Sequence, residues 1–165
     1  MKDIKAAEKL CRRIFKDFYK NKRIKHSERV VKLCEDYAKK LNIKGTDRAV
    51  LIKAAWLHDV GRIIDKEKHN EVKIIKNVFK IYKYDDSDKE DIIELISNHK
   101  GKFCPARLKL RSAILRICDK IDKLNVEMKN CEDNLSEIDK ELEGKKSRKD
   151  FEKITKKILK NVGNN

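Results

Sequence analysis

Apolar residues recur at helical spacing along most of this sequence, and few residues interrupt the pattern. The 165 residues include one proline and five glycines, so a helix is forced to end at few positions. Between residues 27 and 41, for example, Val30, Cys34, Tyr37 and Leu41 lie on one helical face. No alternating strand of useful length and no internal repeat interrupts this pattern, which predicts an all-α bundle. The expected helices cover residues 3–20, 27–41, 47–59, 70–82, 88–99, 106–127 and 148–160.

A shift in composition divides the chain into two parts. A length of 165 residues favours one domain of ordinary size, and we assign the functional domain to residues 1–125. From residue 126 most residues are charged, and the sparse apolar residues still have helical spacing. We therefore expect residues 126–165 to form a charged helical extension. This extension packs on the bundle, pairs with another chain in a homodimer, or is loosely packed.

The chain is strongly basic. Its 43 Lys and Arg residues against 28 Asp and Glu residues give a formal net charge of +15, which suits anionic partners such as nucleic acid, nucleotides or acidic membranes. A general compositional bias is the alternative explanation, because the basic residues are scattered rather than confined to one stripe. The charge alone therefore does not identify a polyanion-binding protein.

Two further features predict a cytoplasmic location. The first 15 residues are charged throughout and lack the apolar core of a signal peptide, and no run approaches the roughly 20 apolar residues of a spanning helix. The cysteines are odd in number and form no CxxC pair, so we expect free thiols and no cysteine-based zinc site. The cysteines are Cys11, Cys34, Cys104, Cys118 and Cys131.

The histidines are the first candidate functional residues. The four in this chain are His26, His58, His69 and His99. Three of them extend apolar helical faces; His26 precedes Val30 by one helical turn, and His99 follows Leu95 by one. A single histidine on such a face is usually a core residue with one hydrogen bond. Four of them, with an aspartate directly after one, indicate a shared site instead.

Carboxylates accompany the histidines. Asp59 follows His58 directly, and Asp119 and Asp122 lie three residues apart on one helix face. Asp119 also has a simpler explanation, an ion pair with Lys123 or with Arg116. Buried imidazoles and carboxylates are costly unless they are paired or bind a metal ion. Mixed nitrogen and oxygen ligands without thiolate suit one or two divalent ions, namely Fe, Mn, Ni, Co, Zn or Mg.

The adjacent positions of His58 and Asp59 restrict where such an ion can lie. Successive side chains on a helix diverge by about 100°, so both can reach one ion only near the end of the helix. Gly61 follows two residues later, where a helix commonly stops.

Three stretches of the sequence match a known pattern. They are HSERVV from residue 26, AAWLHDVGR from residue 54 and LRICDKID from residue 115. Together they resemble the HD-domain superfamily of metal-dependent phosphohydrolases, over about residues 20–125. The resemblance implies an HD-domain-like helical bundle whose primary metal ligands are a histidine, the His-Asp doublet and a distal aspartate. These ligands fall on His26, His58, Asp59 and Asp119.

Some branches of the superfamily hold a second metal ion through two further histidines between the doublet and the last aspartate. His69 and His99 match these positions in order and approximate spacing, so the resemblance implies a dinuclear ligand set. Arg62 stands where the family often has lysine. It still offers a cation for phosphate, but with a different geometry, and this departure affects the expected substrate more than the expected chemistry.

The resemblance implies hydrolysis of a phosphate ester or anhydride of a nucleotide-like substrate. A divalent ion lowers the pKa of a bound water, which makes hydroxide available near neutral pH. The residues expected to act directly are His58, Asp59 and Arg62. The candidates for binding the phosphoryl group, each with the alternative of a plain surface residue, are Arg62, Lys100, Lys102 and Arg107. Asp122 either orients a ligand or pairs with a lysine.

Three alternatives remain open at this point. Some members of the superfamily use a di-iron centre and oxygen, with a similar ligand set. A nucleic-acid-binding module with a vestigial metal site would explain the charge, although few aromatic residues are present for base stacking. A purely structural helical protein would keep the histidines as core residues. The predicted partner is a phosphorylated small molecule, with nucleic acid not favoured and no membrane.

Overall fold

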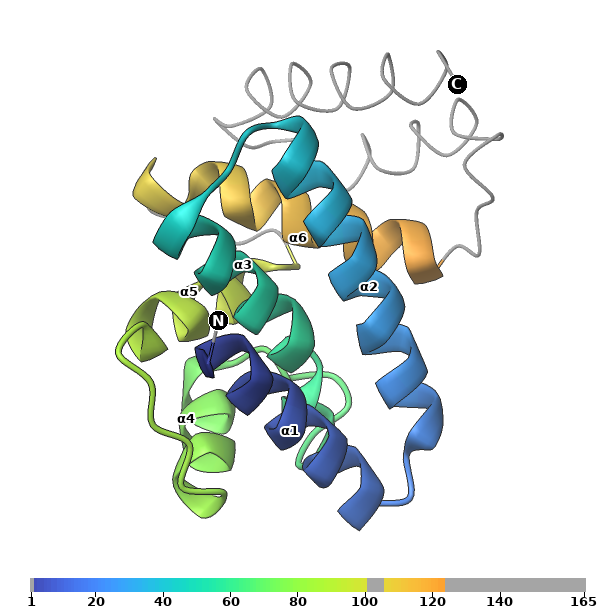
Figure 1. Ribbon diagram of the computed structural model, residues 1–165. Helices are drawn as coiled ribbons and strands as arrows, with labels where there is room; N and C mark the ends of the chain where they lie inside the picture. Colours follow the sequence, from blue (N-terminus) through green and yellow to red (C-terminus); the bar gives the residue numbers. More distant parts are fainter. Residues whose placement is uncertain (1, 101–105, 124–165) are drawn as a thin grey trace. The chain divides into compact units, whose positions relative to one another are not determined.

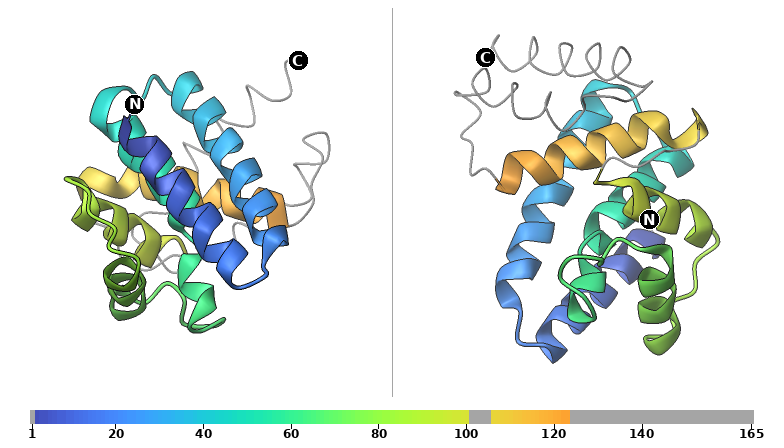
Figure 2. Two further views of the ribbon diagram at one scale, coloured as in Figure 1. Left: turned by 60° about the horizontal axis from the view of Figure 1, so that its bottom comes forward. Right: turned by 180° about the vertical axis from the view of Figure 1, so that it is seen from behind.

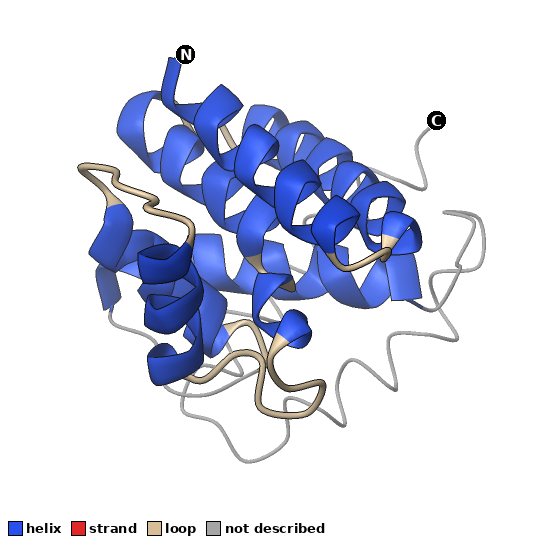
Figure 3. Ribbon diagram, turned by 90° about the horizontal axis from the view of Figure 1, so that it is seen from below, coloured by secondary structure: helices blue, strands red, loops and turns tan. Residues whose placement is uncertain are grey.

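The computed structural model describes residues 2–100 and 106–123. The chain falls into two units, residues 1–118 and 119–165, and each is described by itself. Within the described ranges all regular structure is helical and no strand occurs (Figure 3), which confirms the all-α prediction. The expected helix over 148–160 and the extension 126–165 lie outside the described residues, so the predictions about them remain untested.

The helices begin and end close to the expected positions. They are α1 (Lys2–Asp17), α2 (Asn21–Lys40), α3 (Gly45–Leu57), α4 (Val72–Ile81), α5 (Lys89–Asn98) and α6 (Lys109–Lys123), with the 3-10 helices η1 (Val60–Ile63) and η2 (Ala106–Leu108). The largest difference is at α2, which begins at Asn21 rather than at residue 27. Its first turn carries one apolar residue, Ile24, so the apolar pattern alone underestimates the helix.

α3 is the central helix of the first unit (Figure 1). It packs against α1, α2 and α5, and every residue from Val50 to Leu57 is buried. A helix that is buried all round needs apolar residues on every face. The stretch VLIKAAWL supplies them, apart from Lys53. The apolar run therefore holds the His-Asp doublet in the core.

α1 and α2 run antiparallel and pack on α3 (Figure 2). The buried residues of α1 recur at helical spacing and are Ala7, Leu10, Cys11, Ile14 and Phe15. A short turn joins the two helices; the amides of Tyr19 and Lys20 donate to the carbonyls of Lys16 and Phe15 at the end of α1. Tyr19 has a φ of 53°, a left-handed conformation that favours glycine. The turn therefore holds Tyr19 in a strained backbone conformation.

A buried ion-pair network joins α3 to the segment between α4 and α5. Lys53 has no exposed side-chain surface, and its Nζ donates to Asp86 at 2.8 Å and to Asp88 at 2.9 Å. The Tyr84 hydroxyl also donates to Asp86, at 3.0 Å. Burial by itself lowers the pKa of Lys53, but the two carboxylates outweigh burial and raise it. The buried ammonium therefore has the opposite charges that its burial requires.

The described residues also bear on two predictions about the chain's environment. Cys11 and Cys34 are buried free thiols, as expected. Burial raises the pKa of Cys11 to about 12, which keeps this thiol protonated. None of the described helices combines the length and the apolar character that crossing a bilayer requires.

Candidate metal centre

The His-Asp doublet lies just beyond the end of α3. The helix ends at Leu57, His58 is its C-cap, and Asp59 leaves helical geometry with φ −106° and ψ 0° before η1 begins at Val60. Both side chains of the doublet are completely buried. Their position agrees with the expectation that adjacent residues share a site only at a helix end.

Three of the histidines are held by the same local contact. Nδ1 of His58, His69 and His99 lies 2.5–2.9 Å from the backbone carbonyl oxygen three residues earlier. Because a carbonyl oxygen can only accept a hydrogen bond, Nδ1 carries the proton in each ring. In the neutral imidazole Nε2 then carries the lone pair, which is the form of the ring that binds a metal ion.

The Nε2 atoms lie close to other potential ligand atoms. Nε2 of His58 is 3.1 Å from Nε2 of His26, and Nε2 of His69 is 3.2 Å from Oδ1 of Asp59. Two ligand atoms that each lie 2.0–2.1 Å from one tetrahedral ion are about 3.3 Å apart. Asp59, His69 and His99 form a buried group whose ligand atoms all lie within 4.8 Å of one another. These separations suit shared coordination of an ion.

Asp59 faces histidines on both sides. Its Oδ1 lies next to His69, whereas its Oδ2 is 3.7 Å from Nε2 of His26. Both oxygens of this carboxylate would therefore be available to hold a metal ion together with different histidines.

Asp59 also holds two arginines, one of which was not predicted. Nε of Arg62 donates to Oδ1 at 2.7 Å, and a terminal nitrogen of Arg23 donates to Oδ2 at 2.8 Å. The two guanidinium groups balance the charge of a carboxylate that has no exposed surface. Arg23 lies three residues before His26 and therefore on the same face of α2. That spacing is the signal in the sequence that identifies Arg23.

Gly61 has a different role from the predicted one. α3 ends at Leu57, and Gly61 lies inside η1. A Cβ atom on Gly61 would collide with the backbone carbonyl of His69. The helix was expected to end at residue 59, and it ends two residues earlier. Gly61 therefore does not terminate the helix directly; glycine is needed here for a close approach between two segments. That approach brings His69 against the doublet.

The other predicted substrate-binding residues fall in different places. Lys100 lies near the group formed by Asp59, His69 and His99, with its Nζ 3.4 Å from Nδ1 of His69. Arg107 pairs at the surface with Asp91 of α5. Lys102 lies outside the described residues. Binding of substrate by these residues stays a prediction.

Asp119 and Asp122 lie near the end of α6, in the second unit. Lys123 donates to Asp119 from one helical turn further on, which is one of the two ion pairs that the sequence suggests. The metal-binding role of Asp119 and the supporting role of Asp122 stay predictions.

The donor set of the first unit fits a divalent metal ion. Nε2 of His69 is buried and has no hydrogen-bond partner among the described residues. It lies 3.2 Å from Oδ1 of Asp59, a separation at which a proton or a metal ion can join the two atoms. An unsatisfied buried polar atom costs about 1–3 kcal/mol, which coordination removes. Because nitrogen ligands dominate, the set suits Fe, Mn, Ni, Co or Zn better than calcium.

Comparison with known proteins agrees with this geometry. A family model described as HD domain matches residues 23–124, which is more than half of the chain. The matched range contains every predicted ligand from His26 to Asp119. A search of curated proteins and a search of solved structures each returned no significant match. The chain therefore belongs to the HD domain family, which is part of a superfamily of metal-dependent hydrolases.

Proposed function

We propose that this protein is a metal-dependent phosphohydrolase that cleaves a phosphate ester or anhydride of a nucleotide-like substrate. One observation carries the proposal. Three buried histidines have their Nδ1 atoms held by backbone carbonyls, and two of the three, His69 and His99, form a ligand group with Asp59. Core histidines that serve only packing have no reason to share one tautomer and gather around one carboxylate.

In this proposal the ligands would hold one or two divalent ions. His26, His58, Asp59 and Asp119 would be the primary ligands, and His69 and His99 would provide for a second ion. A bound divalent ion supplies an acidified water and polarises a phosphoryl oxygen. The carbonyls behind the histidine rings keep the lone pairs directed toward the interior, which is how such outer contacts usually act in metal sites.

Two arginines complete the proposed site. Arg23 and Arg62 each bind one oxygen of Asp59, so they orient this carboxylate. Arg62 is mostly buried, and its remaining contact is with the carbonyl of Lys66 at 3.1 Å. A cation in this position neutralises negative charge that develops on a phosphoryl group. The carboxylate of Asp59 and the guanidinium of Arg62 therefore lie together in the proposed site.

Substitution of Asp59 tests the proposal. The chain is purified without chelator, its metal content is measured by mass spectrometry, and phosphatase and phosphodiesterase activities are assayed with Mn, Fe, Ni or Mg. We expect Asp59→Asn to lose most of the metal and about a thousandfold or more of the activity, since even residues that only support a ligand contribute about 10–100-fold. Asp36→Asn, which changes an exposed carboxylate on α2, should change neither. Retention of metal and rate by Asp59→Asn rejects the proposal.

Two further measurements define the site. His69→Ala and His99→Ala should each lower the metal content from about two ions to about one per chain, and unchanged stoichiometry would indicate a mononuclear site. Turnover without oxygen identifies a hydrolase, whereas oxygen uptake coupled to substrate loss identifies a di-iron oxygenase.

A further inference from the structure

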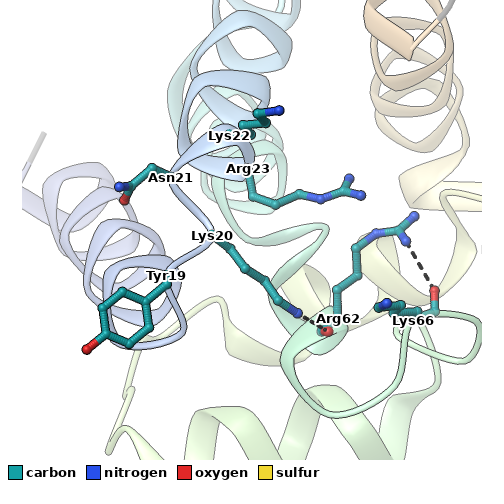
Figure 4. A pocket seen from close by; sticks show the side chains of 7 residues that line it. All are labelled: Tyr19, Lys20, Asn21, Lys22, Arg23, Arg62 and Lys66. Atoms are coloured by element: carbon teal, nitrogen blue, oxygen red, sulfur yellow. Dashed lines mark hydrogen bonds between the residues drawn. The ribbon is translucent and has the colours of Figure 1, made fainter.

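A basic pocket lies next to the arginines that hold Asp59 (Figure 4). Its volume is about 420 Å³, within the roughly 300–1,000 Å³ that is usual for small-molecule sites. The lining residues are Tyr19, Lys20, Asn21, Lys22, Arg23, Arg62 and Lys66. Five of these seven residues are cationic and none is acidic, so the pocket suits an anion.

The contacts within the pocket leave most of this positive charge in place. Nζ of Lys20 donates to the backbone carbonyl of Arg62 at 2.9 Å, and Arg62 donates to the carbonyl of Lys66. These contacts tie the turn before α2 to the segment after η1 without neutralising a cation. Lys22 and Lys66 form no ion pair with any residue that the structure describes. The arginines share Asp59, so the cations of the pocket exceed its one carboxylate partner by four charges.

We infer that this pocket binds a chain of two or more linked phosphates in the substrate. The inference rests on the proposed function and narrows its substrate class. A single phosphate monoester carries a charge of about −1.5 to −2 near neutral pH, which is much less than the pocket offers. A diphosphate or triphosphate group matches the excess charge and extends from Arg62 toward Lys22 and Lys66. The substrate is therefore an oligophosphate, such as a nucleoside diphosphate or triphosphate, rather than a monoester.

The shape of the site favours a small molecule over a nucleic acid. The lining comes from two short segments, residues 19–23 and 62–66, whereas proteins that bind single strands use a basic groove that follows about 4–16 nucleotides. Arg23 and Arg62 belong both to the pocket and to the contacts of Asp59. An oligophosphate in the pocket consequently has one end beside the proposed metal ligands.

Binding of inorganic anions to the full chain tests the inference. Isothermal titration calorimetry with inorganic triphosphate and with orthophosphate compares the unaltered chain with the double variant Lys22→Gln/Lys66→Gln. The matched control is Lys32→Gln/Lys39→Gln, which removes two exposed lysines of α2 outside the pocket. We expect triphosphate to bind at least about tenfold more tightly than orthophosphate. The pocket variant should lose about tenfold per lysine, since each removed contact involves a charged group, and the control should change little.

The outcomes separate this inference from the proposed function. Equal affinity for the two anions, or equal losses in the two double variants, overturns it. Oligonucleotide binding that depends on Lys22 and Lys66, with triphosphate binding that does not, also overturns it and assigns the pocket to nucleic acid. Because anion binding needs no turnover, an inactive chain with the expected triphosphate binding rejects only the proposed function. If the chain hydrolyses phosphate esters but binds triphosphate no more tightly than orthophosphate, only the inference about the pocket is rejected.

Discussion

Two buried charged regions lie along α3 and beyond its end, and they satisfy their charges in different ways. At Lys53, one ammonium meets two carboxylates, Asp86 and Asp88, so each donor faces an acceptor. At the His-Asp doublet, Nε2 of His69 faces an oxygen of Asp59, and both are acceptors in the neutral ring. The first region is complete with protein atoms alone. In the proposed function a metal ion would complete the second region, beside the two arginines that hold Asp59.

The comparison gives a physical criterion for telling structural from functional burial of polar groups. A polar group that serves the fold has its hydrogen-bond partner within the chain, because an unpaired buried charge destabilises the native state. A group that serves a ligand keeps a lone pair or a donor directed at a shared space. On this criterion Lys53 is structural, and the ligand-binding role that we propose for His58, His69 and His99 is the alternative to such a structural role.

The largest expected effect on stability is at the paired network. Lys53→Met leaves Asp86 almost fully buried without its cation, and the loss of one partner of a buried pair typically costs about 3–5 kcal/mol. Urea unfolding should show this decrease in the free energy of unfolding, while the metal content per folded chain stays the same. Lys73→Met, at an exposed lysine of α4, is the control. A loss below about 1 kcal/mol, or loss of metal from folded protein, would contradict the distinction between the two regions.

Gly61→Ala should disturb the region around the His-Asp doublet. The added Cβ collides with the carbonyl of His69, so the segment that carries His69 must move. Overpacking of this kind costs about 1–3 kcal/mol, and we expect metal content and activity to fall together. Gly45→Ala is a useful contrast, because Gly45 has a φ of +56° but open space around its Cβ position. It should lower stability through backbone strain and leave the metal content unchanged; equal metal loss in both variants would argue against the contact with His69.

Acid should weaken the paired network less than the substitution does. Burial on its own raises the pKa of Asp86, but hydrogen bonds from Lys53, the Asp88 amide and Tyr84 outweigh it and hold the pKa below 3.8. A carboxyl group with a lowered folded pKa stabilises the protein above its unfolded pKa, and this contribution is lost as the pH falls through the folded value. The free energy of unfolding should therefore decline as the pH falls below about 3.8. In Lys53→Met this decline should be shallower, as urea unfolding across a pH series can show; identical slopes would exclude the pairing as the cause.

The smallest effects are expected at two left-handed turn residues, one beside each region. Tyr19, with φ 53°, lines the basic pocket, and Lys83, with φ 52°, directly precedes Tyr84 of the network. Replacement of either by glycine should raise the free energy of unfolding by about 0.5–1 kcal/mol, because glycine removes the strain. Asn42→Gly, at φ 56°, should gain less, since asparagine tolerates this conformation. Thermal unfolding measures all three, and destabilisation by Tyr19→Gly would mean that the added freedom of glycine in the unfolded chain outweighs the relief of strain.

Much of the fold was predictable because it depends on local pattern. Helical periodicity identified the helices from α1 to α6, and it placed the AAWL run in the core, where Ala54 to Leu57 are buried. The weakest prediction was the start of α2, since its first turn has too few apolar residues to show a face. The family was also predictable, from the chemical types and order of the histidines and aspartates, and the match over residues 23–124 confirms it.

The contacts across the chain were not predictable in this way. Arg23 and Asp59 are 36 residues apart, and Lys53 and Asp86 are 33 apart; no periodic pattern relates such positions. The role of Gly61 was not predictable either, because position 61 must be glycine only where the backbone carbonyl of His69 approaches it.

The sequence by itself determined the all-α class, the buried α3 and the set of histidines and aspartates that identifies the family. These properties follow from residue type and spacing, which act over one or two helical turns. The tertiary structure decided which ring nitrogen of each of three histidines faces the interior, which arginines hold Asp59, and where a basic pocket lies beside it. These properties depend on how separate helices pack, because packing determines which distant side chains share one low-dielectric space.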